Sequence, residues 1–118
     1  MASTWYSVVI DAHDPRAQGA FWAAVLDWRV DVDDDDEVSI CGPGEFGVGA
    51  PGLTFVPVPE GKSVKNRLHL DLNPTDQDAE VDRLLALGAT RADVGQGEQT
   101  WVVLADPEGN EFCVLSAR

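Results

Sequence analysis

The stretch VKNRLHLDL, residues 64–72, alternates leucines with arginine, histidine and aspartate. Such alternation is typical of a β-strand, so Arg67, His69 and Asp71 would share one face of it. An imidazole can move protons or ligate a metal ion, and Arg67 and Asp71 can pair with each other or hold an anionic or hydroxylated ligand. The polar face is therefore either an ordinary solvated surface or a binding site.

A second set of candidate residues belongs to the last expected strand, EFCVLSA. Glu111 and Cys113 are two residues apart and would share a face. The turn signal DPEGN joins this strand to TWVVLA, which carries Trp101. Cys113 can be a thiolate ligand or a nucleophile, although a free cysteine in a strand is ordinarily a small buried residue. Because Cys41 is the other cysteine, the sequence gives no disulfide framework.

The elements that would position these residues occur in one order, repeated. Asp14 followed by Pro15 marks a helix start, and apolar residues at helical spacing extend this helix to about residue 26. Thr75 or Asp76 would cap a second helix. Each helix follows a strand and precedes about three further strands, so the pattern predicts an internal duplication.

Two connecting segments have unusual compositions. The acidic run at residues 31–37 repels itself and is interpreted as a solvated turn between strands. The glycine-rich segment CGPGEFGVGAPG lacks the lysine and the following helix of a phosphate loop. It is interpreted as a hairpin or a mobile cover loop, and whether residues 42–52 form a lid is left open. In LTFVPVPE, Pro57 and Pro59 predict either an edge strand or a strand exit.

Composition narrows the classes of function. The chain has 118 residues, 44% of them hydrophobic, and a formal net charge of −13. This acidity argues against binding to nucleic acid or to anionic membranes. No apolar run approaches the roughly 20 residues of a membrane span, and the N-terminus does not resemble a signal peptide. We therefore expect a cytoplasmic protein with reduced thiols.

Four segments in this order resemble the vicinal oxygen chelate superfamily, which includes glyoxalase I, bleomycin-resistance proteins and extradiol dioxygenases. The segments are VVIDAHDPRAQGAFWAAVLDW, KNRLHLDL, RLLALGAT and DPEGNEF. Within this superfamily, the chain is similar to short glyoxalase-like domain proteins. The resemblance implies an α+β domain over residues 1–118, with module one at about 1–60 and module two at about 61–118. Two βαβββ modules would form a curved eight-stranded sheet around a cup, with the helices outside.

The resemblance also implies which way the side chains of residues 64–72 point. His69 and its polar neighbours would face the cup. The leucines at positions 68, 70 and 72 would face a helix, where burial stabilises a fold by about 1.5–3 kcal/mol per side chain. Superfamily proteins of this kind commonly assemble into homodimers, so the resemblance implies a homodimer.

Metal-dependent members of the superfamily hold a divalent ion with side chains from the first and fourth strands of each module. Residue by residue, these positions match only His69 clearly. The equivalent of His69 in module one is Ser7, the last-strand position is Cys113 with Glu111 two residues earlier, and the fourth strand of module one has no carboxylate before Glu60. No cofactor is therefore predicted, and a divalent metal at His69 is left open.

The function expected is the binding of a small organic molecule in the cup, with a degenerate metal site. One alternative is a metal-dependent lyase, isomerase or dioxygenase-type enzyme that uses His69 as base or metal anchor and Arg67 to stabilise negative charge. The other is a non-catalytic protein-interaction module. The predicted ligand-binding residues are Trp5, Ser7, Arg67, His69, Asp71, Trp101, Glu111 and Cys113.

Overall fold

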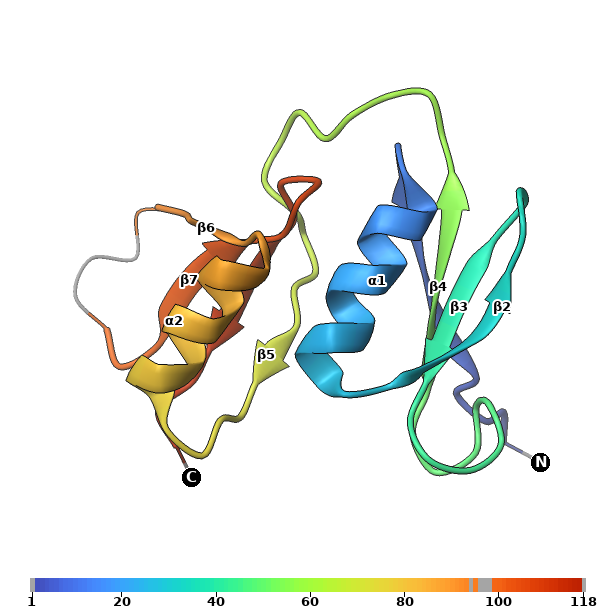
Figure 1. The fold of residues 1–118 in the computed structure, drawn as a ribbon, viewed down its shortest axis with the longest axis horizontal. Helices are drawn as coiled ribbons and strands as arrows, with labels where there is room; N and C mark the ends of the chain where they lie inside the picture. The colour runs from blue at the N-terminus through green and yellow to red at the C-terminus, as the bar shows by residue number, and fades with distance from the viewer. Residues whose placement is uncertain (1, 94, 96–98, 118) are drawn as a thin grey trace. The chain divides into compact units, whose positions relative to one another are not determined.

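The computed structural model describes residues 2–93, 95 and 99–117. Its chain divides into two compact units, Met1–Gly61 and Lys62–Arg118, and each is described by itself. Each unit consists of one helix packed on one face of a four-stranded mixed sheet (Figure 1). The predicted α+β class with two βαβββ modules is confirmed. The joining of the two sheets into one cup stays a prediction.

Unit 1 contains one pair of parallel strands, and the chain between them forms a helix and two further strands. Its elements are β1 (Ser7–Ala12), α1 (Pro15–Leu26), β2 (Arg29–Asp33), β3 (Val38–Cys41) and β4 (Gly52–Pro57). The strand order is β1-β4-β3-β2, with β1 parallel to β4 and the other neighbours antiparallel. The helix lies where its cap and apolar spacing predicted it.

The start and the packing of α1 follow from its sequence. The Asp14 side chain accepts a hydrogen bond from the backbone N–H of Ala17 at 3.2 Å, which satisfies a helix N-terminal donor. Phe21, Trp22 and Val25 lie on the buried face of the helix. Gly19 permits close contact with β3, because a Cβ at this position would lie 2.6 Å from Val38 Cγ1.

Unit 2 repeats this topology with shorter strands. Its elements are β5 (Asp71–Leu72), α2 (Gln77–Leu87), β6 (Thr90–Arg91), β7 (Val102–Ala105) and β8 (Glu111–Val114), in the sheet order β5-β8-β7-β6. Of the two predicted caps, Asp76 is the one that caps α2, and it accepts from Ala79 N–H at 3.1 Å. Val81 and Leu84, which lie one turn apart on α2, are buried. Of the segment ATRADV, residues 89–94, whose composition predicts a possible strand, only Thr90 and Arg91 form one, and Val94 lies outside the described residues.

The predicted strand over residues 66–72 is mostly irregular, which corrects the expectation for the opening stretch. Only Asp71 and Leu72 form a strand, although Leu70 O also accepts from Cys113 N–H at 2.9 Å. The backbone N–H of Asn66 donates instead to the Glu111 side chain, so the segment leaves the ladder at this end. Leu68 is 87% exposed and does not face a helix, contrary to its predicted burial.

Two further expectations for unit 1 are decided by the sheet. β4 lies between β1 and β3, so the edge-strand alternative for the proline-containing strand is wrong, and Pro57 marks the strand exit. The glycine-rich segment connects the antiparallel strands β3 and β4, as the hairpin alternative predicted. Its Phe46 ring packs edge-to-face on Tyr6, with ring centroids 5.1 Å apart.

The predicted turn between β2 and β3 is formed by residues 34–37 of the acidic run, whereas residues 31–33 belong to β2. The side chain of Asp34 accepts hydrogen bonds from the backbone N–H groups of Asp36 and Glu37, both at 2.9 Å.

The helices described are too short or too polar to cross a membrane.

Candidate functional site

A hollow of about 330 Å³ opens on one face of the unit 2 sheet. Its lining comes from the segment before β5, from β5, β7 and β8, and from the residues that flank them: Lys65, His69, Asp71, Trp101, Val103, Glu111, Cys113 and Leu115. Along β7 and β8 the intervening residues Leu104, Phe112 and Val114 are at most 1% exposed. Because strand residues alternate between faces, these three side chains point to the face that α2 covers (Figure 1). The hollow therefore lies on the other face of the sheet.

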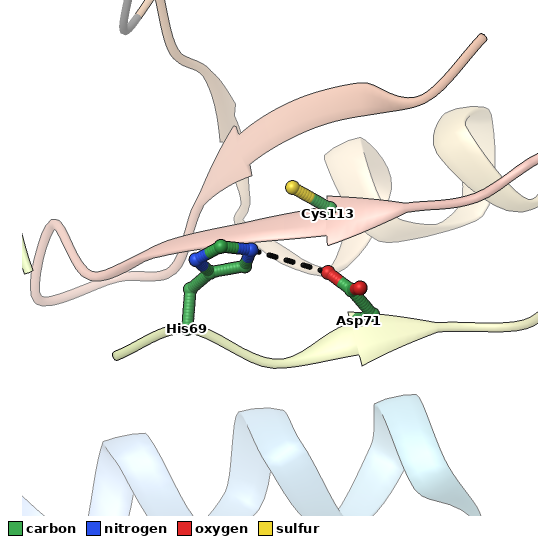
Figure 2. Close-up of side chains that lie close together, drawn as sticks. All are labelled: His69, Asp71 and Cys113. Carbon is green, nitrogen blue, oxygen red and sulfur yellow. Dashed lines mark ion pairs between the residues drawn. The ribbon is translucent and has the colours of Figure 1, made fainter. Parts of the chain in front are cut away.

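Three side chains of different chemistry meet in this hollow (Figure 2). His69 Nε2 lies 3.2 Å from Asp71 Oδ1. The metal-ligating atoms of His69, Asp71 and Cys113 all lie within 4.8 Å of one another. Parallel pairing of β5 with β8 causes this proximity, because Asp71 is the register partner of Cys113. The predicted convergence of His69 and Asp71 on one face is thus present locally, without a regular strand at His69.

Cys113 is 8% exposed, and its surroundings oppose ionisation of the thiol. Burial raises the pKa of Cys113, and the nearby carboxylate of Asp71 raises it further. A thiol with a raised pKa is a poor nucleophile near neutral pH, because the thiolate is the reactive form. The environment of Cys113 therefore disfavours a role as a nucleophile. A role as a metal ligand remains open.

Glu111 lines the hollow but is held by contacts with the first residues of unit 2. Lys62 Nζ lies 2.6 Å from Glu111 Oε2, and Asn66 N–H donates to Glu111 Oε1 at 2.9 Å. Burial by itself would raise the pKa of this carboxyl group, but the hydrogen bonds from Lys62 and from backbone N–H groups outweigh it and lower the pKa. Glu111 is thus an ionised anchor for the segment before β5, and its charge is already compensated.

The structure brings five of the eight predicted ligand-binding residues to this hollow: His69, Asp71, Trp101, Glu111 and Cys113. Arg67 is exposed, and the described lining does not include it. Trp5 and Ser7 belong to unit 1, where Trp5 is 69% exposed. Sequence reasoning missed Lys65, although it continues the alternation of 67, 69 and 71 by one step.

The residues of unit 1 that correspond to this cluster follow from strand register. Val9 pairs with Thr54 between β1 and β4, as Asp71 pairs with Cys113 between β5 and β8. Ser7 lies seven residues before the helix cap Asp14, as His69 lies seven residues before the cap Asp76, so Ser7 is the equivalent of His69 and Val9 that of Asp71. Thr54, the register partner of Val9, is therefore the equivalent of Cys113. The Ser7 and Thr54 hydroxyl oxygens lie 3.1 Å apart and are hydrogen bonded to each other.

A four-ligand metal site of the superfamily type does not fit these residues. Such a site needs nitrogen or carboxylate ligands from the first and fourth strands of both modules. Unit 1 offers two neutral hydroxyl groups at these positions, and each already has a partner in the other. Imidazole, carboxylate and thiolate are the usual ligands of divalent transition metals, and a serine or threonine hydroxyl is not among them. Sequence reasoning missed Thr54 because it looked only for a carboxylate on that strand.

Two βαβββ units are the architecture that the resemblance to the vicinal oxygen chelate superfamily implied. Residues 7–115 match the family model described as glyoxalase-like domain, and the chain belongs to that family. A search of the curated proteins gave no match.

Several solved structures share the fold over nearly the whole chain. A glyoxalase/bleomycin resistance protein/dioxygenase family enzyme from Burkholderia phytofirmans is 20% identical, with a TM-score of 0.70 over 95% of this chain and 97% of that one. A fosfomycin resistance protein from Mesorhizobium loti is 13% identical, with a TM-score of 0.69 and coverage of 100% and 94%. A bleomycin-binding protein from Streptomyces verticillus, solved with copper(II)-bleomycin, is 17% identical, with a TM-score of 0.59 and coverage of 100% and 99%. At these identities the likeness establishes the fold.

Proposed function

We propose that this protein binds a small organic molecule in the hollow of unit 2. The observation that carries the proposal is the lining of that hollow, which combines apolar and polar side chains. Trp101, Val103 and Leu115 supply apolar surface, and Lys65, His69 and Asp71 supply polar groups. A volume of about 330 Å³ lies at the lower end of the range for ligand pockets, which is about 300–1,000 Å³.

The chemistry of the lining favours a planar or aromatic ligand with at least one hydrogen-bonding group. Trp101 is 36% exposed, so its indole ring has free surface for stacking. His69 and Asp71 have side chains that are 42% and 52% exposed and can reach a bound molecule. One relative by fold is described as binding bleomycin, a large organic molecule. The lyase, isomerase or dioxygenase alternative differs in needing the metal ligands that unit 1 does not supply.

Fluorescence titration with a panel of small aromatic compounds, and separately with metal-free bleomycin, tests this proposal. We expect at least one compound to quench tryptophan emission with saturation and to raise the melting temperature of the protein. Trp101→Ala should weaken that binding at least about tenfold, since truncation of a central aromatic anchor to alanine costs about 1–2 kcal/mol or more. Trp28→Ala, in unit 1, is the matched control and should leave affinity unchanged. Binding that is indifferent to Trp101→Ala would place the ligand elsewhere.

A further inference from the structure

We propose that His69, Asp71 and Cys113 bind one zinc ion within unit 2, without help from unit 1. This is a different site from the four-ligand site of the superfamily. It takes all three ligands from one unit: Asp71 from β5, His69 from the segment before β5, and Cys113 from the neighbouring strand β8. One of them, Asp71, lies outside the superfamily positions. The proposal does not rest on small-molecule binding.

The types of ligand select zinc among the common divalent ions. An imidazole nitrogen, a carboxylate oxygen and a cysteine sulfur are the three ligand types that zinc sites combine. Magnesium and calcium prefer oxygen ligands alone, so the thiol of Cys113 disfavours both. Zinc therefore suits the donor set of His69, Asp71 and Cys113, and cobalt(II) can report on the same geometry.

The distances between the ligand atoms come close to those of a tetrahedral zinc site. Zinc bonds of about 2.0–2.3 Å place neighbouring ligand atoms about 3.3–3.6 Å apart. The Nε2 atom of His69 and the Oδ1 atom of Asp71 are already 3.2 Å apart. Because the three ligand atoms lie within 4.8 Å, a side-chain movement of about 1 Å completes the set.

The backbone allows this movement where it is needed. Cys113 is fixed on β8, where its N–H donates to Leu70 O at 2.9 Å. His69 and Asp71 have side chains that are 42% and 52% exposed, so both can adjust their rotamers toward the sulfur (Figure 2). The site thus has one fixed ligand and two adjustable ones.

The charges of the proposed ligands match that of a divalent ion. Asp71 and the thiolate that Cys113 would become on metal binding supply two negative charges, and Lys65 on the same hollow adds one positive charge. Glu111 lines the hollow as well, but its charge is compensated by Lys62 at 2.6 Å. A divalent ion would then be bound with its charge close to balanced, and three ligands would leave a fourth position for water or a bound molecule.

Titration of the metal-free protein with cobalt(II), followed by displacement with zinc, tests the site directly. We expect one cobalt per chain, with a thiolate-to-cobalt charge-transfer band in the near ultraviolet that zinc abolishes. Mutation of a residue that only orients a metal ligand typically weakens metal binding about 10–100-fold. Loss of a direct ligand should weaken binding more than this. His69→Gln and Asp71→Asn should therefore weaken binding more than about 100-fold, and Cys113→Ser should remove the charge-transfer band.

Two controls separate this site from binding at the second cysteine and from binding at the superfamily positions. Cys41→Ser changes the second cysteine, which is buried in β3 of unit 1, and should leave the band and the affinity unchanged. The double variant Ser7→Ala and Thr54→Val removes both hydroxyls at the superfamily positions and should also bind normally. If Cys113→Ser fails to fold by circular dichroism, the partly exposed His69 and Asp71 variants still give the test.

Three results would overturn the proposal. The first is the absence of any charge-transfer band at saturating cobalt. The second is a band that disappears with Cys41→Ser rather than with Cys113→Ser. The third is loss of affinity in the Ser7 and Thr54 double variant, which would show that metal binding needs both units. Retention of organic-ligand binding in chelator-treated protein keeps failure of the zinc site distinct from failure of the small-molecule proposal.

Discussion

Unit 1 and unit 2 share their order of elements but differ at one set of equivalent positions. At the positions of His69, Asp71 and Cys113 in unit 2, unit 1 has Ser7, Val9 and Thr54. In unit 1 the two hydroxyls satisfy each other at 3.1 Å. In unit 2 an imidazole, a carboxylate and a thiol converge on a hollow. The same fold thus carries a hydrogen-bonded pair of hydroxyls in unit 1 and a cluster of potential metal ligands in unit 2. The difference depends on three side chains.

The units also differ in how firmly their parallel strands pair. β1 and β4 pair over six residues, whereas β5 contributes two residues to its pairing with β8. The segment before β5 is instead fixed by the contacts of Glu111 with Lys62 and Asn66. Side-chain interactions in unit 2 therefore take the place of ladder hydrogen bonds that unit 1 makes along its longer strands.

The largest expected effect comes from transferring the cluster to unit 1. The triple variant Ser7→His, Val9→Asp and Thr54→Cys gives β1 and β4 the same three side chains in the same register. If the cluster binds cobalt as proposed, the variant should bind two ions per chain, with a gain of more than about 100-fold in affinity at the second site. Stoichiometry from the charge-transfer band measures this. A folded variant that still binds one ion would show that strand register alone does not define the site.

A smaller effect is expected from breaking the side-chain anchor of unit 2. Lys62→Met leaves the Glu111 carboxylate buried and without its cation, which should lower the free energy of unfolding by about 3 kcal/mol. Urea denaturation followed by circular dichroism measures the change. Adding Glu111→Gln to the variant removes the uncompensated charge and should restore part of the loss. A stability equal to that of the parent protein would mean that the anchor contributes little.

The smallest effect is expected from the hydroxyl pair of unit 1. Ser7→Ala removes one partner of Thr54 and should lower the free energy of unfolding by about 1 kcal/mol, the typical contribution of a hydrogen bond between neutral groups. Combining it with Thr54→Val should cost less than the sum of the single changes, since no unpaired hydroxyl remains. A double-mutant cycle from denaturation curves measures this coupling. Strictly additive losses would contradict a direct interaction.

Part of the site was predictable because alternation fixes which residues share a strand face. Spacing alone pairs His69 with Asp71, and Glu111 with Cys113. Lys62 could not be found by the same reasoning. It lies in a loop without hydrophobic periodicity, and its partner Glu111 is 49 positions away in the sequence. The exposure of Leu68 was missed for a related reason, since the periodic pattern of the stretch continues where the regular strand is absent.

The sequence by itself determined the two helices, the cap of the first helix, the repeated order of elements and the family, since these depend on short-range spacing and on motifs in a fixed order. Only the tertiary structure decided which residues meet across strands. The register between β5 and β8 brings Cys113 beside Asp71, and the register between β1 and β4 brings Thr54 into line with Cys113. Register depends on hydrogen bonds between segments about 40 residues apart, so local sequence patterns leave it undetermined.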